Sequence, residues 1–227
     1  MPRLYVFAEG QTEQTFANLV LRDHLASFGV YLQPAVLIAH ARKKGKTHRG
    51  GGRRYQPLRK DVETFLRQEK SNDVFFTTMI DLYALYSDFP GQQEAAKLSH
   101  LPYERVKFLE SAFHQDLGGD PRLIPHLQLH EFEACLYCKP EAFVGFYPGT
   151  TREVGEIRAI AEAYDSPELI NDGQHTAPSK RIAQHFPDYL KAKSVVGPAL
   201  AAQIGLSCIR ERCPHFDLWL TRLETLV

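Results

Sequence analysis

The chain has 227 residues, of which 44% are hydrophobic and 24% charged, a composition typical of a globular protein and unlike that of a disordered or fibrous one. Lysine plus arginine and aspartate plus glutamate number 27 each, so the overall charge does not point to nucleic acid and any basic surface must be local. No apolar run approaches the roughly 18–20 residues that span a bilayer, and Met1-Pro2-Arg3 leads into a strand-like run without a small-residue cleavage site, which predicts a cytoplasmic protein with no membrane partner.

The first predicted element is an apolar strand over residues 4–8, which runs directly into Glu9, Gly10 and then Glu13 at the start of a helical pattern over residues 12–28. Packing explains these two carboxylates poorly, because a core accepts neither their charge nor its desolvation cost. The two carboxylates at this turn therefore indicate a catalytic role, with a metal ion.

A second strand is predicted over residues 35–39, and it is followed by a segment rich in arginine, lysine and glycine that contains no acid. Such a segment is able to neutralise several phosphates of a nucleic acid, although a solvated surface loop has the same composition. Gly45-Lys46-Thr47 imitates the end of a phosphate-binding P-loop, but the first glycine of that pattern would fall at His40, which excludes an NTPase site here. The basic residues of this segment are Arg42, Lys43, Lys44, Lys46, Arg49, Arg53 and Arg54.

The strand-helix pattern then repeats. A helix is predicted over residues 57–69, and an uninterrupted apolar strand over residues 73–80 ends at Asp81. Helical segments fill most of residues 93–116, and a fourth strand over residues 123–129 runs into the acidic stretch 130–133. This alternation predicts an α/β fold, a mainly parallel sheet flanked by helices.

Beyond Pro140 the predicted elements are helices broken by prolines, with no convincing strand. We therefore divide the chain into an α/β core over residues 1–139 and a helical C-terminal cap over residues 140–227 that packs on the core. The final helix is amphipathic and carries its apolar residues at core spacing. The cap is expected to serve either a homodimer or a partner protein. The apolar positions of the final helix are Phe216, Trp219, Leu220, Leu223 and Val227.

Three acids follow three different predicted strands: Glu9, Asp81 and Glu131. Ligands of parallel sheets collect outside the carboxyl ends of the strands, so these side chains are expected to converge there. Each acid alone is more typical of a helix cap. Together they would repel one another without a cation, and an all-oxygen site suits Mg²⁺ or Mn²⁺.

The cysteines support a rival prediction. Cys135 and Cys138, with the looser pair Cys208 and Cys213, have a spacing that is compatible with a structural zinc ion. The first pair lies in an apolar stretch, however, where cysteine behaves as a small buried hydrophobe, and we favour that interpretation.

The stretch 6–13, the strand ending at Asp81 and the stretch 127–133 together resemble the Toprim-like bacterial family catalogued as domain of unknown function 4276. The stretches 176–181 and 213–216, with Trp219 and Leu220, extend the resemblance over nearly the whole chain. It implies a Toprim fold and metal-dependent phosphodiester chemistry, as in topoisomerases, primases and overcoming-lysogenization-defect nucleases.

The resemblance also implies roles for single residues. Glu9 matches the glutamate that acts as acid, base or ligand, Asp81 matches the first aspartate of an Asp-x-Asp element, and Glu13 matches the second acid of the nuclease branch. The chain departs from the pattern at Tyr83, which stands where the second aspartate is expected. If two metal ions bind, Asp88, Glu131 or Glu133 must replace that ligand, and the number of ions stays open.

Two cations complete the predicted site. Lys180, as a catalytic residue, and Arg181, as a nucleic-acid contact, are able to contact the scissile phosphate or its neighbours, although a surface pair at a helix start fits equally well. His130 has the chemistry of a base or ligand, but at the end of a buried strand it is more typical of a structural residue.

The function predicted from these features is a Mg²⁺- or Mn²⁺-dependent nuclease of Toprim type. The resemblance further implies a bacterial anti-phage defence setting and an ATPase partner that gates cleavage. The alternative is a non-catalytic module that binds nucleic acid or a partner through a degenerate Toprim site, which the tyrosine at position 83 favours.

Overall fold

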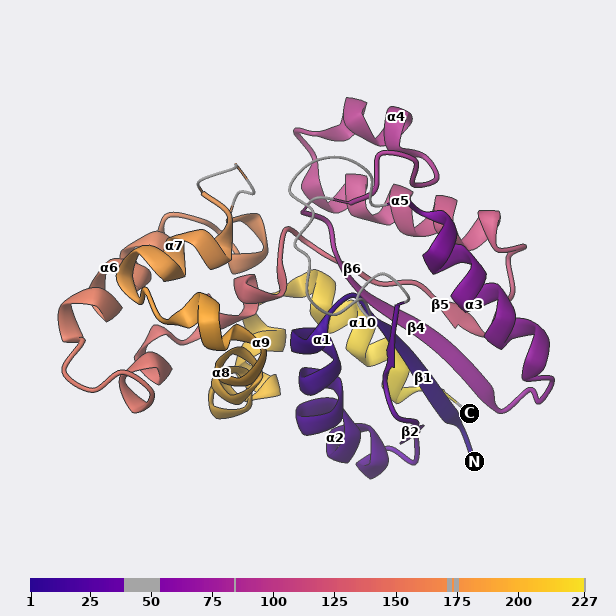
Figure 1. Cartoon of the computed structure of the whole chain (residues 1–227), viewed down its shortest axis with the longest axis horizontal. Helices are drawn as coiled ribbons and strands as arrows, with labels where there is room; N and C mark the ends of the chain where they lie inside the picture. Colours follow the sequence, from indigo (N-terminus) through magenta and orange to yellow (C-terminus); the bar gives the residue numbers. More distant parts are fainter. Residues whose placement is uncertain (39–53, 84, 171–172, 174–175, 227) are drawn as a thin grey trace.

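The computed structural model describes residues 1–38, 54–83, 85–170, 173 and 176–226. A parallel sheet with helices on both faces makes up one side of the molecule, and helices between residues 151 and 212 lie beside it (Figure 1). The predicted α/β class with a helical C-terminal region is therefore confirmed.

The centre of the sheet is formed by β1 (Arg3–Ala8) and β4 (Val74–Asp81), which pair in parallel from Arg3 opposite Val74 to Ala8 opposite Met79. Both strands are apolar over nearly their whole length because helices cover both faces of the sheet. The predicted strands over residues 4–8 and 73–80 are thus confirmed.

Each edge of the sheet is formed by two short strands instead of one. On one edge β2 (Tyr31–Leu32) and β3 (Val36–Leu37) both pair with β1, and on the other β5 (Leu123–Ile124) and β6 (Leu127–Gln128) both pair with β4, all in parallel. A proline lies at each interruption, Pro34 and Pro125, and a proline has no N–H to donate to the neighbouring strand. Pro125 therefore splits the predicted strand 123–129. Of the predicted strand 35–39 the structure shows Val36–Leu37, and residue 39 lies outside the described residues.

Helices cover the two faces of the sheet. On the first face lie α1 (Gln11–Phe16), a π-helical turn η1 (Ala17–Leu21) and α2 (Arg22–Ser27), which follow one another without a break, together with α10 (Pro214–Glu224). The second face packs against α3 (Gln56–Gln68) and α5 (Pro102–Asp116). Alternate residues of β1 enter the two cores, Val6 the first and Phe7 the second.

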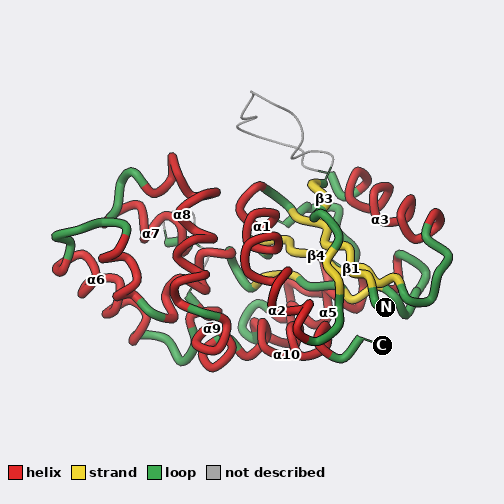
Figure 2. The backbone as a smooth tube through the Cα atoms, turned by 90° about the horizontal axis from the view of Figure 1, so that it is seen from below, coloured by secondary structure: helices red, strands yellow, loops and turns green. Residues whose placement is uncertain are grey.

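The C-terminal third is helical, and among the described residues no strand follows β6. Figure 2 shows its main helices on the opposite side of α1 from α3. These helices are α6 (Thr151–Glu162), α7 (Pro178–His185), α8 (Tyr189–Ile204) and α9 (Leu206–Arg212). The short elements are α4 (Gln92–Ala95), η3 (Ala96–Leu98), η4 (Phe132–Cys138), η5 (Pro140–Gly145) and η6 (Pro167–Leu169).

The last helix, α10, returns to the sheet. Its buried face contains four of the five predicted apolar positions, Phe216, Trp219, Leu220 and Leu223, and Val227 lies outside the described residues. The indole of Trp219 donates a hydrogen bond to Thr77 Oγ1 of β4 at 2.8 Å. The first core consequently joins Leu4 and Val6 to residues of the C-terminal third such as Phe216. Within the described residues no single helix is long and apolar enough to cross a membrane, and the pair α8 and α9, which reaches that length only together, is bent by 85°.

Candidate functional site

The carboxyl ends of β1, β4 and β6 bring the predicted acids to one edge of the sheet. Glu9 directly follows β1, Asp81 closes β4, and Glu131 and Glu133 follow β6. The backbone N–H of Asp81 donates to Glu9 Oε2 at 2.9 Å, and the N–H of Phe132 donates to Asp81 Oδ1 at 2.9 Å. The three strand ends are therefore linked through the acids themselves.

Backbone geometry after β6 turns the chain toward this edge. His130 has φ 61°, in the left-handed region that non-glycine residues rarely adopt, and its carbonyl accepts a hydrogen bond from Tyr83 N at 2.7 Å. That conformation costs about 1–2 kcal/mol, which the surrounding contacts must offset. It is followed by the 3₁₀ segment η4, whose first turn contains Glu133.

Glu13 folds back over the start of α1. Its Oε2 accepts a hydrogen bond from Gly10 N at 2.8 Å, in a capping box that satisfies an N–H at the helix start. A Cβ atom at position 10 would lie 3.0 Å from the same oxygen, so Gly10 leaves room for this close approach. Glu13 is buried, with 6% of its surface exposed.

The two glutamates after β6 are also buried. Glu131 Oε2 accepts a hydrogen bond from Ser179 N in the first turn of α7, at 2.8 Å, a position where a helix favours negative charge. Glu133 is fully buried; its Oε1 accepts from Tyr189 Oη at 3.1 Å and lies 3.2 Å from Lys193 Nζ. Its Oε2 has no hydrogen-bond partner, which is costly for a buried carboxylate oxygen.

Three of the five acids have raised pKa values. Burial raises the pKa of Asp81 well above its usual range, and the charges of Glu13, Glu9, Glu133 and Glu131 raise it further. Burial and then Glu9 raise the pKa of Glu13 to about 7, and burial and then Glu133 raise the pKa of Glu131. A bound cation would relieve the repulsion between these acids.

A lysine that the sequence analysis missed faces these acids. Burial lowers the pKa of Lys193 on α8, but Glu133, Asp81, Glu13 and Glu131 together raise it above its usual value. The sequence feature that could have indicated Lys193 is its position in a largely apolar helix, which also contains Gly197 and Pro198. It was uninformative by itself, because only the packing of α8 on α1 and η4 brings Lys193 to the sheet edge.

Two of the other predicted cations directly follow Ser179, whose N–H donates to Glu131, on α7. Lys180 is exposed on α7, and no ion pair joins it to any of the five acids. The Arg181 side chain donates to Thr176 O at 2.7 Å and to Tyr164 Oη at 3.4 Å. In the basic segment only Arg54, which is exposed, belongs to the described structure. The remaining members lie outside the described residues: Arg42, Lys43, Lys44, Lys46, Arg49 and Arg53.

Asp88, one candidate for the missing ligand, accepts a hydrogen bond from Tyr55 N at 2.9 Å and is exposed. Glu131 and Glu133 are therefore the acids that stand beside Asp81 in the structure. Three of the four cysteines are buried, all are free, and Cys138 Sγ contacts Cys213 Sγ at 3.5 Å. Their surroundings agree with the role of small buried hydrophobes.

The donor set at the sheet edge fits a hard divalent cation. It consists of carboxylate oxygens, one of which is buried without a partner, and such ligands are preferred by Mg²⁺ and Mn²⁺. Backbone N–H groups hold one oxygen each of Glu9, Glu13, Asp81 and Glu131. The acids consequently do not close on a single point, and among the described residues they form no group of ligand atoms that all lie within 4.8 Å of one another.

Fold and site together define an α/β protein with a parallel sheet and a partly buried acidic cluster at its carboxyl edge. The family model described as Domain of unknown function (DUF4276) matches residues 8–224, and the chain belongs to this family. The comparison with curated proteins found no match, and the comparison with solved structures found none either.

Proposed function

We propose that the protein is a divalent-metal-dependent nuclease that cleaves nucleic-acid phosphodiesters. The observation that carries the proposal is the gathering of five acids and Lys193 at the carboxyl ends of three parallel strands. Structural packing alone does not explain this arrangement, since neighbouring acids raise the cost of ionising Glu13, Asp81 and Glu131.

The resemblance to Toprim domains supports the same chemistry. Glu9 follows the first strand, Asp81 closes the strand beside it, and Glu13 lies one helical turn after Glu9, in the order that the Toprim nucleases have. Tyr83 occupies the position of the second aspartate. In the proposed site Glu131 or Glu133 replaces it from the neighbouring strand β6.

The acids Glu9, Glu13, Asp81, Glu131 and Glu133 would hold Mg²⁺ or Mn²⁺. When bound, the ion would withdraw charge from a phosphate oxygen and favour deprotonation of water. Lys193 is placed to stabilise negative charge that develops beside Glu133. Glu13, whose pKa is about 7, is suited to exchange a proton near neutral pH.

The basic segment supports nucleic acid as the substrate. The chain leaves the described structure at Ile38, whose N–H donates to Ala8 O at 3.1 Å, and Ala8 directly precedes Glu9. Seven cations therefore follow in sequence from the same edge of the sheet as the acids. Arg181 and Lys180 remain proposals for contacts farther along the bound strand.

The biological setting is proposed from the family resemblance. It consists of a cytoplasmic role in bacterial anti-phage defence, together with an ATPase partner that gates cleavage. The helices beside the sheet offer a surface for that partner or for a homodimer.

A binding module is the second candidate function. Tyr83 favours it, because a tyrosine in place of the second aspartate removes one ligand from the expected set. In that case the acids would bind a cation or a partner without hydrolysis.

Cleavage assays separate the two functions. The purified protein is incubated with single-stranded, double-stranded and supercoiled DNA and with RNA, in Mg²⁺ or Mn²⁺ and with a candidate ATPase. The variants are Glu9→Gln and Asp81→Asn, with Glu162→Gln, an exposed acid at the end of α6, as the matched control. We expect metal-dependent cleavage in the parent protein and the control, and none in the two site variants.

Cleavage that survives both site substitutions would contradict the assignment of the site. Salt-sensitive binding without cleavage on any substrate, with the ATPase present, would establish the binding module instead.

A further inference from the structure

A second group of metal-binding side chains lies away from the acidic edge. Glu110 of α5, His126 between β5 and β6, and His215 of α10 each offer one ligand atom, and these atoms all lie within 4.8 Å of one another. The group holds none of the residues of the proposed nuclease site. We propose that it binds a zinc ion that fastens α10 to the sheet and to α5.

The distances fit one ion. Glu110 Oε1 lies 3.0 Å from His215 Nε2 and 3.8 Å from His126 Nδ1. Zinc–nitrogen and zinc–oxygen bonds are about 2.0–2.2 Å, so the ligand atoms of a tetrahedral zinc ion are roughly 3.4 Å apart. The two observed separations lie on either side of that value, each within a few tenths of an ångström of it.

His126 supplies the independent reason to expect a ligand. It is fully buried, and neither of its ring nitrogens has a hydrogen-bond partner. A neutral imidazole carries one donor and one acceptor, and leaving buried groups unsatisfied costs about 1–3 kcal/mol each. An ion that accepts the Nδ1 lone pair satisfies one of these positions.

The surroundings hold His126 and Glu110 in place. The ring of Trp219 stacks on His126 with centroids 4.3 Å apart, and the N–H of Leu127 donates to Glu110 Oε1 at 2.8 Å. The rings of His126 and His215 are stacked at 5.0 Å and 20°, so one ring must turn before both nitrogens point at one ion. His215 is the ring that turns, because it is less enclosed than His126.

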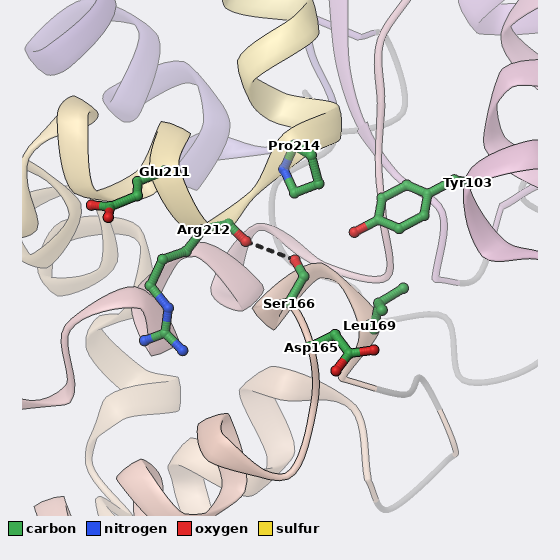
Figure 3. Close-up of a pocket in the computed structure, with 7 residues that line it drawn as sticks. All are labelled: Tyr103, Asp165, Ser166, Leu169, Glu211, Arg212 and Pro214. Carbon is green, nitrogen blue, oxygen red and sulfur yellow. Dashed lines mark hydrogen bonds between the residues drawn. The ribbon is translucent and has the colours of Figure 1, made fainter.

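A pocket lies beside the first residue of α10. This pocket of about 620 Å³ lies between Tyr103 of α5 and Pro214, the residue before His215, with Ser166 hydrogen-bonded to the Arg212 carbonyl beside it (Figure 3). Tyr103 Oη donates to Glu168 Oε2 at 3.4 Å, and the same oxygen accepts from His215 N at 3.0 Å. Glu168 thus connects a residue that lines the pocket to the backbone of His215, and a water molecule would supply the fourth ligand.

Imidazole and carboxylate ligands select zinc over Mg²⁺, since nitrogen ligands suit borderline transition ions and all-oxygen sites suit Mg²⁺. The ion would join residues 110, 126 and 215, which come from three separate elements. Its role is therefore to stabilise the fold, and no part of the cleavage chemistry depends on it.

Zinc binding by variants tests the proposal. The full-length protein is stripped with a chelator and dialysed into excess Mg²⁺, which occupies the acidic edge, and zinc is then titrated while the bound metal and the Tm are measured. Glu110→Gln and His215→Gln remove ligands. His185→Gln is the matched control, because His185 Nδ1 pairs with Glu156 Oε2 at 2.8 Å without a third ligand.

We expect one equivalent of zinc and a higher Tm for the parent protein and the control, and at least a 100-fold weaker affinity for the two ligand variants. Equal zinc binding by all four proteins, or no zinc binding by the parent, would overturn the proposal.

A second measurement needs no variant. Trp219 is the only tryptophan of the chain, and its ring lies against His126, so bound Co²⁺ should quench its fluorescence with one-site saturation and zinc should restore it. Fluorescence that does not respond to Co²⁺ would show that the group is only a hydrogen-bonded cluster.

Discussion

Glu9 accepts a hydrogen bond from the backbone N–H of Asp81 at 2.9 Å, which ties the acid after the first strand to the last residue of β4. The bond fixes the Glu9 carboxylate without neutralising it. Asp81 in turn accepts from Phe132 N, so the acidic edge is assembled by the backbone of the neighbouring strand ends.

Lys193 should matter more to cleavage than Lys180. Lys193→Met removes the cation 3.2 Å from Glu133 and is expected to lower kcat by roughly 100-fold or more, in the range found for lost electrostatic stabilisers. Since it also removes a competing positive charge, Mg²⁺ affinity should rise. Steady-state kinetics and Mg²⁺ titration measure both effects.

Lys180→Met is the paired variant, and its kcat should stay within a few-fold of the parent because Lys180 is exposed and pairs with none of the acids. A larger loss of kcat in Lys180→Met than in Lys193→Met would show that Lys180, and not Lys193, is the catalytic lysine.

The close packing of α8 should be sensitive to one methyl group. A Cβ at Gly197 would lie 2.9 Å from Tyr189 Oη, 3.4 Å from a Phe132 ring carbon and 3.6 Å from a Thr12 methyl carbon. Gly197→Ala should lower the free energy of unfolding by about 1–3 kcal/mol, because the core there is filled. It should also displace the hydroxyl that binds Glu133.

Gly155→Ala in α6 is the control, since a Cβ there meets nothing within 4 Å and alanine favours a helix by up to about 1 kcal/mol. Urea unfolding compares the free energies of unfolding of the two variants. Equal changes would show that the packing of α8 does not require a glycine at position 197.

The stability of the metal-free protein should fall as pH rises from about 4.5 to about 7. The pKa of Glu13 is about 7 in the folded protein and 4.5 in a solvated chain, so between these values the folded state binds more protons than the unfolded state. The raised pKa of Asp81 acts in the same direction. Thermal unfolding in a chelator across this pH range measures the effect.

Excess Mg²⁺ should reduce that loss above pH 7, because cation binding favours the ionised acids. In Glu13→Gln, the pH dependence should become shallower. A metal-free protein that grows more stable over the same range would contradict the proposed coupling of the acids.

The basic segment should set the salt dependence of nucleic-acid binding. Replacing Lys43, Lys44 and Lys46 by glutamine should make the slope of log K against log salt less steep by about 2–3, if each cation neutralises one phosphate. Fluorescence anisotropy with labelled strands at several salt concentrations measures the slope. A control with the same change of net charge carries glutamine at the exposed positions Lys60, Lys70 and Lys97.

The sequence alone was sufficient for the two central strands and for placing three acids at one edge of the sheet. Residues 4–8 and 73–80 are apolar runs buried on both faces, and parallel strands present their carboxyl ends at one edge, so Glu9, Asp81 and Glu131 were expected to lie near one another. Pro34 and Pro125 also predict that each edge strand is split, because proline has no N–H to donate in a hydrogen bond to the neighbouring strand.

Only the tertiary structure decided which cation stands opposite the acids and which histidines meet. Lys193 and Lys180 are both basic residues near helix starts, and nothing local distinguishes them; the packing of α8 on α1 does. Likewise His126 and His215 are 89 positions apart and meet because α10 returns to the sheet. Side-chain periodicity specifies which face of an element is buried, whereas contacts between distant elements depend on how all the elements pack together.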